Sequence, residues 1–193
     1  MKAKESVSTY PIRKKVHTYE DYLALPDDRK QYQILEGELV MTPAPFVIHQ
    51  QIGLRLKLRF VQFVETHSLG YVFDAPCDVV LSKTNVLQPD ILFISNQNIK
   101  VITEKNIQGA PDLVVEIISP STAYYDLFDK KEIYQKFGVK EYWLVDPKKE
   151  WIEIHTLDKG SYQLHHRAAK KGSVQSKLLI GFAVDLKELF KKN

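Results

Sequence analysis

Cysteine is almost missing from this chain of 193 residues, because Cys77 is the only one. A single cysteine excludes an internal disulfide and a zinc site built from cysteines. Long apolar runs are missing as well, and none approaches the roughly 20 residues of a membrane-spanning helix. The first fifteen residues are polar and basic, unlike a secretory signal. We therefore expect a cytoplasmic protein without a membrane partner.

The chain also lacks internal repeats, low-complexity tracts and linkers long enough to divide it. Its hydrophobic content of 44% and charged content of 26% are ordinary for a globular protein with its own core. The net charge of +3 permits a nucleic-acid partner without requiring one. We expect a flexible basic arm over residues 1–16 and a single domain over residues 17–193.

Hydrophobic periodicity and turn residues predict alternating strands and helices. The expected helices are 17–25, 46–66 and one from 121 or 122 to about 137. The expected strands are 32–35, 38–41, 70–81, 86–95, 111–119, 141–145, 151–155 and 162–165. This order is typical of an α/β domain with a mixed sheet.

The strand predicted over residues 111–119 carries one carboxylate, Glu116, deep in an apolar run. Such a charge is costly to bury unless a proton, a cationic side chain or a metal neutralises it. Asp112 shares its face, but four residues of strand separate the two by about 13 Å, too far to hold one metal. Glu116 therefore needs a partner from another element.

A second apolar run supplies an acidic partner, since Asp90 follows Pro89 near the start of the strand predicted over 86–95. If the two strands are neighbours, Asp90 and Glu116 come together. Two carboxylates on adjacent strands suit a hard divalent cation, Mg²⁺ or Mn²⁺, with water and substrate oxygens completing its shell.

These residues resemble the PD-(D/E)XK nuclease superfamily and, over roughly residues 18–160, the bacterial Uma-type restriction endonuclease family. The matching positions are residues 35–39, 43–45, His49, 88–91, 109–122, Asp126, Lys130, Tyr134 and 138–147. The resemblance implies a restriction-endonuclease-like fold, in which helices flank a central mixed sheet. It also implies a metal-dependent endonuclease that hydrolyses DNA phosphodiester bonds, with Asp90 and Glu116 as metal ligands, and a homodimer.

One position departs from the superfamily pattern, in which a lysine stands two residues after the acidic one. Ile118 occupies that place here. The following helix offers Lys130 and Lys131, and the family pattern favours Lys130. Asp126 and Tyr134 lie one helical turn from Lys130 on either side, so the three share a face. Lys130 could hold the attacking water or the scissile phosphate, or it could form an ordinary surface pair with Asp126.

Glu38 resembles the additional acidic residue near the N-terminus of such nuclease sites, so it is the fourth catalytic candidate; it could equally be an exposed strand carboxylate. His49 opens the long helix and could touch a phosphate or orient Glu38. A non-catalytic module on the same fold that binds nucleic acid or a partner is the alternative function, and it would explain Ile118. A hydrolase of a small phosphoester is a third reading, favoured by a pocket too narrow for a duplex.

Overall fold

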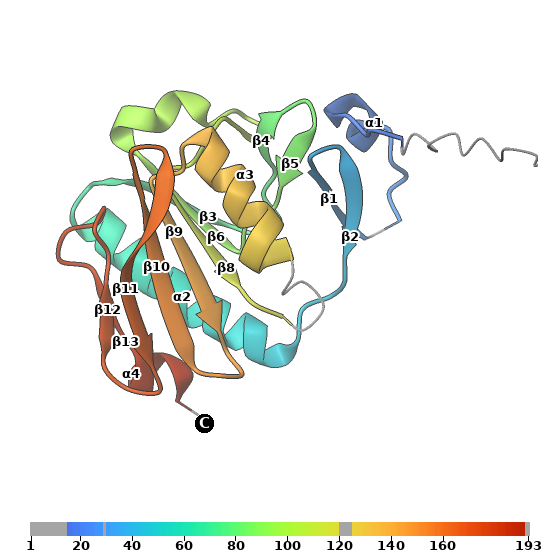
Figure 1. The fold of residues 1–193 in the computed structure, drawn as a ribbon. Helices are drawn as coiled ribbons and strands as arrows, with labels where there is room; N and C mark the ends of the chain where they lie inside the picture. Colours follow the sequence, from blue (N-terminus) through green and yellow to red (C-terminus); the bar gives the residue numbers. More distant parts are fainter. Residues whose placement is uncertain (1–14, 29, 120–124, 192–193) are drawn as a thin grey trace, which may run out of the picture.

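A six-stranded mixed sheet forms the centre of the computed structural model, which describes residues 15–28, 30–119 and 125–191 (Figure 1). Its strand order is β11-β10-β9-β8-β6-β3, in which only β8 and β9 run parallel among the paired neighbours. The strands are β3 (Gly70–Asp74), β6 (Ile91–Ser95), β8 (Leu113–Ile117), β9 (Glu141–Asp146), β10 (Trp151–Asp158) and β11 (Ser161–Ala169).

A second sheet of five strands has the order β2-β1-β5-β4-β7, and β12 and β13 form a small ribbon. These strands are β1 (Gln31–Leu35), β2 (Glu38–Thr42), β4 (Val79–Ser82), β5 (Asn85–Leu87), β7 (Ile107–Gln108), β12 (Ser173–Gln175) and β13 (Ala183–Asp185). The predicted hairpin around Glu36 and Gly37 is confirmed, and Gly37 takes the positive φ of 82° that the turn requires.

Helices cover both faces of the six-stranded sheet, as expected (Figure 1). They are α1 (Tyr19–Leu23), α2 (Val47–Thr66), α3 (Lys130–Phe137) and α4 (Leu186–Phe190), with a 3-10 helix η1 (Asn96–Val101) and a π-helix η2 (Tyr125–Asp129). The alternation along β8 explains the two layers: Val115 and Ile117 join the core under α2, whereas Val114 joins the core under α3.

Two predicted strands were too long. The range 70–81 divides into β3 and β4, and the range 86–95 divides into β5 and β6. In each case the two halves belong to different sheets. Pro76 and Pro89 stand at the breaks, and a proline has no N–H with which to continue a ladder. The second break also places Asp90 directly before β6.

The helix signals are mostly confirmed. Thr18 caps α1 through a reciprocal capping box with Asp21, and Gly138 ends α3 in the left-handed conformation with φ 85°. The predicted start of the third helix at residue 121 or 122 lies outside the described residues. So does nearly all of the predicted basic arm, although Lys15 pairs with Asp21 at 3.2 Å. No helix in the described ranges has the length and apolar character to cross a membrane.

Candidate active site

The register between β6 and β8 brings the two predicted metal ligands together. Ile91 and Val115 form the last pair of this antiparallel ladder, so Asp90 follows directly beyond it, close to the end of β8 that holds Glu116. The Asp90 carboxylate also holds the end of β8, because its Oδ2 accepts a hydrogen bond of 2.7 Å from the Ile117 N–H.

His49 contacts Asp90 from the first turn of α2. Its Nε2 lies 3.2 Å from Asp90 Oδ2, and its side chain is mostly buried. The sequence led us to consider Glu38 or a phosphate as its partner. The contact found in the structure is with Asp90, so His49 restrains the Asp90 carboxylate, and its contact with a phosphate stays a prediction.

Glu116 is held from the opposite layer by α3. Lys130 Nζ lies 2.9 Å from Glu116 Oε2, and the Tyr134 hydroxyl donates a 2.8 Å hydrogen bond to Oε1. The side chains of Glu116 and Lys130 are only 3% and 6% exposed. One helical turn separates Lys130 from Tyr134, which is why both reach the same carboxylate. The side chain of Asp126, the third residue expected on this face, lies outside the described residues.

Lys131 points away from Glu116, so Lys130 is the lysine that contacts this carboxylate. Burial lowers the pKa of Lys131, and the nearby charge of Glu153 on β10 partly opposes that shift. The Lys131 charge in turn contributes, after burial, to the lowered pKa of His155. Successive helical residues point about 100° apart, so only Lys130 fills the space beside Glu116 that Ile118 leaves without a lysine.

Glu38 does not join this group. It is exposed on β2 and lines a separate hollow of about 470 Å³ with Glu36, Asp129 and Glu132. Burial and then the charges of Glu132 and Glu38 raise the pKa of Asp129. Thr42, at the other end of β2, does line the cavity with Asp90 and Glu116. Glu38 and Thr42 lie four strand residues apart, which is about 13 Å. This distance explains why the two residues line different cavities.

A cavity of about 830 Å³ is lined by four of the residues described above, namely Asp90, Glu116, His49 and Lys130. Figure 1 shows why: the start of α2, the end of β8 and the start of α3 gather at the same end of the sheet. Sequence reasoning missed a set of glutamines in this cavity, from β1, α2 and the residue two before Asp90. Glutamine is common on surfaces, so the sequence held no signal for them.

The donor set suits a hard cation held in part by substrate and water. No cluster of three or more His, Cys, Asp or Glu side chains arranged for a metal occurs within the described ranges. Mg²⁺ is often held by only one or two carboxylates together with waters and phosphates. Among the described residues, both contacts of the Asp90 carboxylate use Oδ2, so Oδ1 can accept a ligand. An ionised Glu116 keeps further lone pairs on both oxygens.

Comparison with solved structures finds the same fold in a protein described as a putative nuclease from Anabaena variabilis ATCC 29413. The TM-score is 0.74 at 19% identity, over 90% of this chain and 97% of that one. This comparison shows that the chain has the fold of that protein.

The sequence profile of the Uma2 family, described as "Putative restriction endonuclease", matches residues 19–187. The chain belongs to this family, which confirms the resemblance drawn from its motifs. No curated protein matches the chain.

Proposed function

We propose that this protein is a metal-dependent endonuclease that hydrolyses DNA phosphodiester bonds, with Asp90 and Glu116 as the ligands of Mg²⁺ or Mn²⁺. The observation that carries the proposal is that both carboxylates line one open cavity, with Asp90 directly beyond the last pair of the β6–β8 ladder. Membership of a family described as "Putative restriction endonuclease" agrees with it.

A bound divalent cation would supply Lewis-acid stabilisation of the phosphate and a more acidic water. The protein's own part is positioning. His49 and the Ile117 N–H hold the Asp90 carboxylate, while Tyr134 holds Glu116. Lys130 carries a positive charge at the cavity wall, where it can neutralise charge that develops on a phosphate oxygen or orient the attacking water.

The test is nicking of supercoiled plasmid with Mg²⁺ or Mn²⁺ by the wild type and three variants. Asp90→Asn, Glu116→Gln and Lys130→Met should each lower the rate by about 10²–10³-fold, the usual cost of removing a group that stabilises the transition state. Lys131→Met is the matched control, because it changes the adjacent lysine that points to Glu153.

Plasmid left intact by the wild type with either metal, or equal nicking by Glu116→Gln, would contradict the proposal. DNA binding without nicking would favour the alternative of a non-catalytic nucleic-acid-binding module. The observation that favours that alternative is the buried Lys130–Glu116 ion pair, in which the lysine balances the charge of the carboxylate.

Three further expectations belong to the same proposal. Glu38 assists catalysis only if the hollow it lines joins the site on binding DNA, so Glu38→Gln should change nicking far less than Glu116→Gln.

The homodimer expected from the family resemblance would let one enzyme cut two strands, and sedimentation analysis tests it directly. Fractionation of cells that produce the protein would test the expected cytoplasmic location.

A further inference from the structure

Glutamines are concentrated in the cavity that holds Asp90 and Glu116. Five of the chain's eleven glutamines line it, namely Gln31, Gln33, Gln50, Gln51 and Gln88. We call these five the glutamine wall. Each amide offers a donor and an acceptor side by side, the pattern that proteins use to read the edges of nucleic-acid bases.

Two residues of the glutamine wall are held firmly. Gln33 Nε2 donates to Thr42 Oγ1 at 2.9 Å, and Gln33 Oε1 accepts the Gln88 N–H at 3.0 Å. Gln88 Nε2 donates to Asp78 at 2.8 Å, which orients that amide. Gln88 Oε1 is buried and accepts no hydrogen bond from the described part of the chain. An acceptor left in this state costs about 1–3 kcal/mol.

The other three amides have their hydrogen-bonding groups available. Gln50 and Gln51 are exposed on the first turns of α2, and Gln31 is partly exposed at the start of β1. Neither backbone nor side-chain partners within residues 15–28, 30–119 and 125–191 engage these three side-chain amides. They can therefore pair with a ligand without first breaking bonds within the protein.

Apolar side chains accompany the amides. Pro43, Pro45, Val47 and Leu54 also line the cavity, and Phe46, 58% exposed, stands between two of them in sequence. Polar edges beside apolar faces match the chemistry of a nucleobase, which hydrogen-bonds at its rim and stacks on its faces. A cavity of about 830 Å³ is also in the size range of sites that enclose a small ligand.

We infer that the glutamine wall binds the base of an unpaired nucleotide, so that the substrate is single-stranded or locally unpaired DNA. This inference rests on the proposed nuclease function. In a duplex each base is paired and stacked, and it can enter a cavity only after it leaves the helix. The side chains of Glu116 and Lys130 are only 3% and 6% exposed. This low exposure agrees with a substrate that enters the cavity.

Fluorescence anisotropy with labelled 12-mers, in Ca²⁺ instead of Mg²⁺ to limit cleavage, tests the inference without relying on activity. The probes are single-stranded deoxyadenosine, an abasic strand with the same phosphates, and a duplex. We expect deoxyadenosine to bind at least tenfold tighter than either other probe. Gln50→Ala/Gln51→Ala should reduce its affinity to that of the abasic strand.

Gln62→Ala is the matched control, since Gln62 is exposed on the same helix outside the cavity lining. It should leave binding of every probe unchanged. Equal affinity for the deoxyadenosine and abasic strands, or tighter binding of the duplex, would overturn the inference. If plasmid is still nicked in that case, the proposed nuclease stands and only the base subsite fails. Base-dependent binding without nicking under any metal would instead count against the nuclease alone.

Discussion

Glu116 and Glu141 are both buried carboxylates on the adjacent parallel strands β8 and β9, yet their surroundings differ. Glu116 faces a lysine and a tyrosine and lines a cavity. Glu141 is fully buried and accepts hydrogen bonds from four groups that carry no charge. They are the Trp143 indole, the Ser176 hydroxyl and the main-chain N–H groups of Lys177 and Leu178, at 2.6–2.8 Å.

The difference teaches that burial of a carboxylate does not by itself mark a functional site. Glu141 ties the segment that begins at Ser176 to β9, so its role in the structure is to hold the C-terminal part of the chain against the sheet. Glu116 is set apart by the cavity beside it, which Asp90 also lines.

The largest expected effect on stability is at Glu141. Glu141→Ala leaves two N–H groups, an indole and a hydroxyl without their acceptor in a buried place. We expect the free energy of unfolding to fall by about 4 kcal/mol, measured by urea denaturation. Glu104→Ala, in an exposed loop, is the control. If both variants unfold at the same urea concentration, the structural role given to Glu141 is wrong.

The Lys130–Glu116 pair should behave differently. Lys130→Met leaves a buried carboxylate without its positively charged partner and should destabilise the fold by about 3 kcal/mol. In the double variant Glu116→Gln/Lys130→Met the charge is gone, and most of that stability should return. A double-mutant cycle measures the coupling. A double variant no more stable than Lys130→Met would show that the pair makes no specific contribution.

Asp112 combines a charged partner, as Glu116 has, with a main-chain N–H donor, as Glu141 has. Its contacts predict that the stability of the fold depends on pH. Its burial raises the pKa, but hydrogen bonds from Lys140 Nζ and the Ser95 N–H outweigh that and leave the pKa below the usual 3.8. The folded state therefore binds this proton less readily than the unfolded chain. The resulting stability is present above pH 3.8 and is lost as the pH falls through the lower folded pKa.

Urea titrations at pH 6 and at pH 2.5 check this prediction. Between these values wild type should lose more stability than Asp112→Asn, which carries no titrating group at that position. Equal losses in the two proteins would show that Asp112 does not contribute to acid sensitivity.

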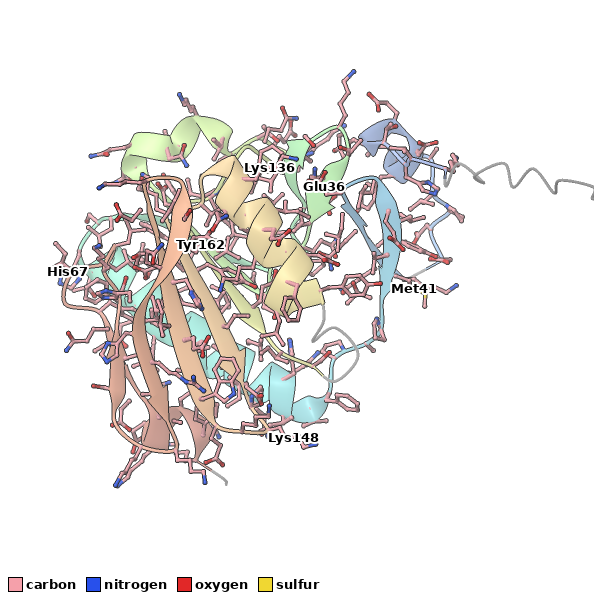
Figure 2. All side chains as sticks on the ribbon, viewed as in Figure 1. Glu36, Met41, His67, Lys136, Lys148 and Tyr162 are labelled. Atoms are coloured by element: carbon pink, nitrogen blue, oxygen red, sulfur yellow. The ribbon has the colours of Figure 1, made fainter. Side chains whose placement is uncertain are left out.

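The smallest effect is expected at the surface. Lys136 on α3 and Glu36 in the β1–β2 turn lie 3.0 Å apart, but both side chains are more than half exposed (Figure 2). Solvent screens such a pair, so Lys136→Ala should change the free energy of unfolding by less than about 0.5 kcal/mol. A loss as large as that of Lys130→Met would show that exposure does not separate these two ion pairs.

Local patterns predicted most elements of the fold. The capping box at Thr18, the glycine after Phe137 and the apolar stripe of α2 all depend on neighbours in sequence, and all were found. The strand ranges failed where a chain segment passes from one sheet to another, at Pro76 and Pro89. Sheet membership depends on partners far away in the sequence, which no local pattern records.

The sequence by itself determined that Glu116 lies in a buried strand, that a lysine is missing at Ile118 and that the chain resembles the Uma-type nucleases. Only the tertiary structure decided that Lys130 rather than Lys131 meets Glu116, that His49 holds Asp90, and that Glu38 lies in another hollow. The reason is physical: a residue's type and period set which face it occupies, but the packing of separate elements sets what that face meets.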